Sequence, residues 1–127
     1  MAKKILLVED EEDILKTLEL ILTKEGFFVT TAQDGVAALN KLRTEVFDLI
    51  ILDLMLPKWD GFKLCAAIKQ DKRHRETPVI VLTAKAQESD RQRCLEYGVD
   101  EYMTKPFDPD ILITKIKALI ERSRDIS

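Results

Sequence analysis

The stretch "LIILD" at residues 49–53 places four aliphatic side chains directly before a single carboxylate. Apolar residues on consecutive rather than alternate positions are typical of a parallel strand whose two faces are both covered. The stretch "VIVLT" at residues 79–83 repeats the pattern and ends on a hydroxyl. Because a carboxylate beside buried aliphatic residues is costly unless it is paired, Asp53 is expected to meet a positive charge.

Shorter apolar runs at Ile5–Val8, Phe28–Ala32 and Tyr102–Met103 predict further strands. Segments of helical period lie between and after the predicted strands. Their apolar residues are Ile14, Leu18, Ile21 and Leu22; Val36, Leu39 and Leu42; Phe62, Leu64, Cys65 and Ile68; Cys94 and Leu95; and Leu112, Ile116, Leu119 and Ile120. The pattern predicts a doubly wound α/β fold with five helices around a five-stranded parallel sheet. Right-handed crossovers favour the flavodoxin-like strand order 2-1-3-4-5.

Length and composition limit the function classes. The 127 residues indicate a single domain over 1–127, and the net charge of -3 disfavours direct binding of nucleic acid. No stretch reaches the roughly 18 apolar residues of a membrane span, and the N-terminal segment lacks a signal-peptide core. Cys65 and Cys94 are read as buried small apolar side chains in a reducing compartment. We therefore expect a cytoplasmic protein without membrane contact.

Charged and hydroxyl side chains follow the predicted strands. Glu9 and Asp10 follow the first, Asp53 the third, Thr83 the fourth and Lys105 the fifth. In an open α/β sheet these positions share the carboxyl edge, where ligands bind. The three carboxylates would repel one another without a cation, and carboxylate oxygens are ligands that Mg2+ prefers. We expect a Mg2+ site there, with Mn2+ as the alternative.

A carboxylate can also act as a nucleophile toward phosphorus. A lysine would then neutralise the phosphoryl oxygens, and a hydroxyl would donate a hydrogen bond to one of them. Simpler explanations exist for each residue. Asp53 could cap a strand end and Thr83 a helix. Glu11, Glu12 and Asp13 are well placed to start the first helix, which Asp10 or Glu11 could cap.

Four segments together resemble the receiver (CheY-like) domain of two-component response regulators. They are "LLVEDEEDI", "FDLIILDLMLPKWDG", "PVIVLTAK" and "GVDEYMTKPF", and the resemblance extends from Lys4 to about Arg122. It implies that Asp53 is the phosphoacceptor and that Asp10 and Asp53 bind the metal directly. It also implies that Glu9 acts through metal-bound water and that the Met55 carbonyl completes the metal shell.

The same resemblance implies three further features. Lys105 matches the phosphate-binding lysine, and its bond to Pro106 is expected to be cis. Thr83 matches the switch hydroxyl and Tyr102 the aromatic switch, although Tyr102 could instead be a simple packing residue. Met55 and Lys85, each two residues after a site residue, depart from more reactive members and suggest slow self-dephosphorylation.

The implied function is a signalling switch rather than an enzyme. The switch would assist only its own Mg2+-dependent phosphotransfer and its own slow dephosphorylation. The phosphoryl donor would be a histidine kinase or histidine phosphotransfer protein. The receiver would act alone on an effector protein or as the N-terminal part of a longer regulator with an attached output domain. Its signalling face would be the fourth helix, fifth strand and fifth helix.

Receivers attached to winged-helix domains often form phosphorylation-dependent homodimers through salt bridges on that face. Arg91, Glu101, Lys115 and Lys117 fit this pattern in part, whereas Tyr97 and Ile111 stand where that subgroup carries acids.

Three other functions compete with the switch. A flavodoxin-like electron carrier would need a phosphate-binding loop after the first strand, where acids stand instead. A nucleotide hydrolase would need the G-x-x-x-x-G-K-[ST] motif, which is absent. An aspartyl-phosphate phosphatase would need an acid two residues after Asp53, but that position is Met55.

Two smaller features carry expectations of their own. The run "DKRHRE" at residues 71–76 is read as a solvated loop that includes His74. Gly26 is expected to end the first helix, and Gly61 is expected to supply a permissive φ.

Overall fold

The computed structural model describes residues 2–126, with side chains described as far as Arg122. Its centre is a five-stranded sheet in the order β2-β1-β3-β4-β5, and all neighbouring strands are parallel. The strands are β1 (Lys4–Val8), β2 (Phe28–Ala32), β3 (Leu49–Leu52), β4 (Val79–Thr83) and β5 (Glu101–Thr104). The predicted fold class and strand order are confirmed.

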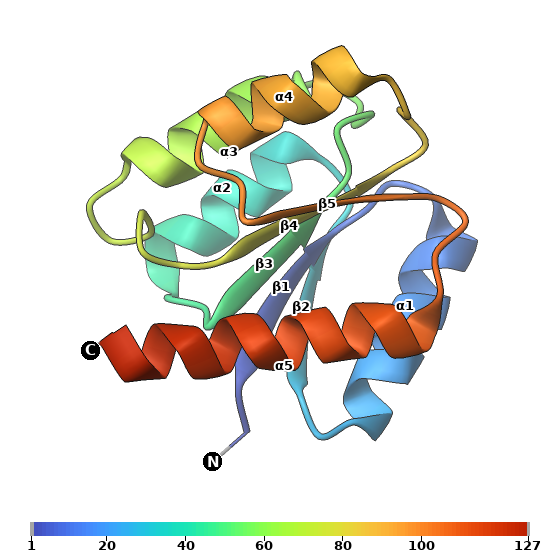
Figure 1. The fold of residues 1–127 in the computed structure, drawn as a ribbon, viewed down its shortest axis with the longest axis vertical. Helices are drawn as coiled ribbons and strands as arrows, with labels where there is room; N and C mark the ends of the chain where they lie inside the picture. The colour runs from blue at the N-terminus through green and yellow to red at the C-terminus, as the bar shows by residue number, and fades with distance from the viewer. Residues whose placement is uncertain (1, 127) are drawn as a thin grey trace.

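Helices cover both faces of the sheet (Figure 1). One face carries α1 (Glu12–Lys24) and α5 (Pro109–Ile126). The other carries α2 (Gly35–Thr44), α3 (Gly61–Gln70) and α4 (Glu88–Glu96). Within the described residues, no helix is both long and apolar enough to cross a membrane.

The central strands explain the runs of consecutive apolar residues. All four residues of β3 are buried, and they alternate between the two helical layers. Ile50 and Leu52 pack beneath α2, α3 and α4, while Leu49 and Ile51 pack beneath α1 and α5. A strand buried on both faces has no solvent side, so it needs no polar alternation.

Two glycines differ in their roles. Gly26 follows Glu25, the C-cap residue of α1, and has φ +93°. Its amide donates to the Thr23 carbonyl, as expected of a glycine that ends a helix. Gly61 does not have a positive φ, so the expected permissive φ is wrong. A Cβ on Gly61 would lie 2.3 Å from Leu54 Cα. Glycine is therefore required there because the backbone of the segment after β3 passes close to α3.

The reading of residues 71–76 as a solvated loop is wrong for His74. Its side chain is only 1% exposed, and its Nε2–H donates to the Leu42 carbonyl at 2.8 Å. The neighbouring Arg73 guanidinium donates to the Arg43 carbonyl at 3.0 Å. These two bonds fasten the turn to the end of α2, whereas Lys72, Arg75 and Glu76 are exposed as expected.

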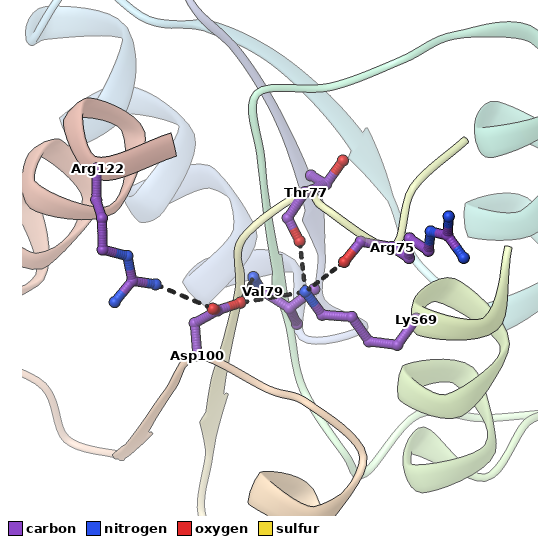
Figure 2. A network of polar contacts seen from close by, with 6 residues as sticks. All are labelled: Lys69, Arg75, Thr77, Val79, Asp100 and Arg122. Atoms are coloured by element: carbon purple, nitrogen blue, oxygen red, sulfur yellow. Dashed lines mark hydrogen bonds and ion pairs between the residues drawn. The ribbon is translucent and has the colours of Figure 1, made fainter. Parts of the chain in front are cut away.

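A polar network joins several elements at the amino edge of the sheet (Figure 2). The Lys69 ammonium donates to the Thr77 carbonyl at 2.7 Å and to the Asp100 carboxylate at 3.2 Å. Asp100 also accepts from the Val79 amide and from Arg122. Asp100 thereby ties α3, the start of β4 and α5 together, on the edge opposite the predicted site.

Candidate functional site

Three carboxylates meet at the carboxyl edge of the sheet. Glu9 and Asp10 follow β1, Asp53 follows β3, and each offers an oxygen within 4.8 Å of the others. Parallel strands produce this meeting because neighbouring strands end at the same edge. Glu9 and Asp53 are buried, while Asp10 is exposed. A set of carboxylate oxygens this close together suits a hard divalent cation.

Lys105 supplies the positive charge that Asp53 was expected to meet. Its Nζ lies 2.6 Å from Glu9 Oε1 and 2.9 Å from Asp53 Oδ2. Burial would lower the lysine pKa, but the hydrogen bonds to Glu9 and Asp53 outweigh it and raise the pKa above its ordinary value. Burial raises the pKa of Glu9 in spite of the bond from Lys105. The ammonium thus holds together two carboxylates that would otherwise repel each other.

Backbone amides fix the second oxygen of each buried carboxylate. The Met55 amide donates to Asp53 Oδ1 at 3.0 Å, and the Glu11 amide donates to Glu9 Oε2 at 3.1 Å. Glu11 occupies the N-cap position of α1, but its side chain makes no capping bond. The expected cap by Asp10 or Glu11 is therefore wrong, and Glu9 satisfies an amide at that helix start instead.

Thr83 is fully buried at the end of β4. Its Oγ1 accepts from the Lys85 amide at 3.3 Å, and its carbonyl accepts from the Lys105 amide at 2.8 Å. The residue at the N-cap of α4 is Gln87, so Thr83 is not the cap of that helix. The hydroxyl therefore lies at the end of β4, the strand next to the one that Asp53 follows. It is bonded to the segment that leads to α4.

Tyr102 lies half-buried on β5, and its hydroxyl donates to the Lys85 carbonyl. Burial raises the pKa of Tyr102 to about 12. Lys85 thus contacts Thr83 through its amide and Tyr102 through its carbonyl. Directly after β5, the Lys105–Pro106 peptide bond is cis.

A cation–aromatic cluster next to the site was missed in the sequence. The Arg93 guanidinium of α4 lies 4.0 Å from the centre of the Phe62 ring on α3, and the Lys85 ammonium lies 5.9 Å from it. Phe62 comes directly after Gly61, and Asp60 caps that helix by accepting from the Phe62 amide at 2.9 Å. No local pattern reveals the cluster because its members come from different elements.

The expected signalling face is only partly as anticipated. Lys115 pairs with Glu101 across α5 and β5 at 2.6 Å, and Ile111 is 50% exposed beside them. Arg91 pairs with Glu88 inside α4. Lys117 instead pairs with Glu25 at the end of α1, so its inclusion in that face is wrong.

Comparison with solved structures gives the class of protein. A CheY-like response regulator receiver domain protein from Methanospirillum hungatei aligns over 100% of both chains with a TM-score of 0.94 and 30% identity. The receiver domain of sensor histidine kinase PA1611 from Pseudomonas aeruginosa aligns over 95% of this chain and 99% of that one, with a TM-score of 0.87 and 33% identity. That structure has a magnesium ion coordinated in its active-site cleft.

The family follows from the sequence. Residues 5–117 match the family model of the response regulator receiver domain, and the chain belongs to this family. The transcriptional regulatory protein PhoP of Bacillus subtilis, named for alkaline phosphatase synthesis, is 48% identical over 97% of this chain and 50% of its own length. The response regulator ArlR of Staphylococcus aureus is 44% identical over 94% of this chain and 53% of its own length. The chain thus spans about half the length of these curated relatives.

Proposed function

We propose that this receiver is a switch that accepts a phosphoryl group on Asp53 from a histidine kinase or a histidine phosphotransfer protein. The observation that carries the proposal is the bridge from Lys105 to Asp53 and Glu9, with Asp10 beside it. One oxygen of Asp53 is bonded to Lys105 and the other to the Met55 amide, so the carboxylate is held in a single orientation.

The carboxylates fit Mg2+, with Mn2+ as the alternative, because their oxygens lie within 4.8 Å of one another. Asp10, Asp53 and the Met55 carbonyl would hold the ion directly, and Glu9 would act through a water. A bound divalent cation neutralises phosphoryl oxygens during transfer. The magnesium ion in the PA1611 receiver domain supports this assignment.

The side chains of this chain then have separate tasks. Asp53 attacks the phosphorus atom, and the donor nitrogen leaves with the electron pair of the broken P–N bond. Lys105 neutralises a phosphoryl oxygen, and Thr83 donates its hydroxyl to another. Because Thr83 is bonded to Lys85, and Lys85 to Tyr102, a movement of Thr83 changes the contacts of both.

Self-dephosphorylation is expected to be slow. The Met55 side chain, two residues after Asp53, is 54% exposed and has no group that could orient an attacking water. Lys85 carries a long cationic side chain at the start of the segment after Thr83, where it can shield the phosphoryl group.

The output would pass through α4, β5 and α5 to an effector protein or to an attached output domain. The length of PhoP and ArlR supports the second arrangement, with residues 1–127 as the receiver part of a longer regulator. A homodimer on this face would use the Lys115–Glu101 pair and the exposed Ile111.

The decisive experiment is intact mass spectrometry after incubation with acetyl phosphate and Mg2+. The wild type should gain one phosphoryl group, and Asp53→Asn should gain none. Asp60→Asn is the matched control, because Asp60 lies in the same segment but caps α3, a role that asparagine also fills. Equal labelling of Asp53→Asn and wild type would refute the assignment.

A further inference from the structure

Cys65 lies on α3 and Cys94 on α4, and these two helices contact each other. Cys65 and Cys94 both have 0% exposed surface and belong to the same buried cluster. The contact with the Cys94 thiol, followed by burial, raises the pKa of Cys65. Since the thiolate is the reactive form and neither sulfur meets solvent, the pair is inert while α4 is closed.

α4 contributes little buried surface to the core. Among the residues of α4, all of which the structure describes, Cys94 alone is buried. By contrast, α3 buries Phe62, Leu64, Cys65 and Ile68. Elements with few buried apolar contacts open locally at low free-energy cost. An opening of α4 would remove Cys94 from the core and from its contact with Cys65.

We propose that Cys65 and Cys94 form an oxidation site to which the opening of α4 controls access, and that hydrogen peroxide oxidises the pair to an intramolecular disulfide. The Cys94 sulfur attacks the peroxide oxygen, the O–O bond breaks, and a sulfenic acid forms with release of one water. The Cys65 sulfur then attacks the Cys94 sulfur, and the oxygen of the Cys94 sulfenic acid leaves as the second water. Hydrogen peroxide gains the two electrons that the thiols lose, and both thiol protons end in water.

The disulfide would fasten α4 to α3 covalently. Its effect on signalling rests on the proposed function, because α4 belongs to the proposed output face. The oxidation itself does not rest on it, since it needs neither Asp53 nor a phosphodonor. The oxidation is therefore measured in Asp53→Asn as well as in wild type. The oxidation result can then be interpreted even if Asp53 is not the phosphoacceptor.

The first test treats the chain with hydrogen peroxide under native conditions. Intact mass should fall by two hydrogen atoms, and proteolysis without reductant should yield one species that links the peptides of Cys65 and Cys94. Cys65→Ser should lose the cross-link and accumulate oxygen adducts on Cys94. Oxygen adducts or intermolecular dimers in wild type without the internal link would overturn the proposal.

The second test concerns the gate. Arg93→Ala removes the contact between α4 and the Phe62 ring, while Arg91→Ala removes only an exposed pair with Glu88 inside α4. A lost cation–aromatic contact should favour opening, so Arg93→Ala should form the disulfide about two- to fivefold faster. Arg91→Ala should match wild type. Equal rates in Arg93→Ala and wild type would show that α4 is not the gate.

Discussion

The Tyr102 hydroxyl donates a hydrogen bond to the carbonyl of Lys85, the residue whose amide donates to Thr83 Oγ1. One residue of the segment after β4 therefore bonds to a side chain at the end of β4 and to another on β5. If Thr83 moves toward a phosphoryl group, its bond to Lys85 must change, and the partner of Tyr102 moves with it. The structure thus provides a short physical connection from the acidic site to the proposed output face.

The protonation of Tyr102 should make stability depend on alkaline pH. Its pKa in the folded protein is raised to about 12 by burial, against about 10 in an unfolded chain. A raised pKa favours folding only while the group keeps its proton, so this contribution is complete below about pH 10 and is lost as pH rises toward 12. Tyr102→Phe should therefore lose less free energy of unfolding over that interval than wild type.

Urea unfolding at a series of alkaline pH values measures this difference. Tyr97→Phe, which leaves Tyr102 as the only tyrosine, allows its ionisation to be followed directly by ultraviolet absorbance. Parallel pH curves for wild type and Tyr102→Phe would contradict the assignment.

Divalent cations should stabilise the fold through the acidic cluster. Mg2+ at a hundredfold excess over its dissociation constant should add about 2.7 kcal/mol to the free energy of unfolding. Asp10→Ala should remain folded, because it relieves repulsion, but lose most of this gain. Asp13→Ala is the matched control, since Asp13 belongs to the same acidic run but lies outside the cluster. Thermal unfolding with and without Mg2+ decides, and an undiminished Mg2+ effect in Asp10→Ala would count against the site.

The sheet could be predicted from sequence because its signal is local. The consecutive apolar residues of β3 and β4 can only be satisfied by burial on both faces, and that requires a parallel sheet between two helical layers. The meeting of Asp53, Asp10 and Lys105 then follows from topology, because residues after parallel strands share one edge. The runs of apolar residues thus predict where each strand ends, and the strand ends predict which residues form the candidate site.

Contacts between separate elements were not predictable in this way. The burial of His74 depends on its bond to the Leu42 carbonyl in α2. The charged residues beside His74 in the sequence predict exposure and give no sign of that distant partner. Lys117 lies on α5, which was expected to share the signalling face with α4 and β5, but its side chain pairs with Glu25 at the end of α1. For Gly61, the sequence indicated the need for glycine but not its cause, which is the closeness of Leu54 rather than a dihedral angle.

That closeness gives a prediction for the segment after Asp53. Gly61→Ala would place Cβ 2.3 Å from Leu54 Cα and 2.5 Å from its carbonyl oxygen, and backbone atoms cannot move aside as a side-chain tip can. The free energy of unfolding should fall by about 3 kcal/mol. Gly26→Ala meets no atom within 4 Å but has φ +93°. It should cost only about 1 kcal/mol through backbone strain. Equal losses in urea unfolding would show that close approach is not the cause.

The last prediction separates phosphorylation from its output at Thr83. Thr83→Ala keeps Asp53, Asp10 and Lys105, so it should still bind a beryllofluoride mimic with Mg2+. Trp59, the single tryptophan, lies in the segment after Asp53 and should report that binding by a change in emission. Without the hydroxyl, the bond to Lys85 is absent before activation and none forms with the mimic, so the population of the active state should not shift. Wild type should show altered amide hydrogen exchange in α4 and α5, and Thr83→Ala should lose most of that change. Thr83→Ser retains the hydroxyl and should behave like wild type. If Thr83→Ala shows the same exchange changes as wild type, the connection from Thr83 through Lys85 to Tyr102 does not carry the signal.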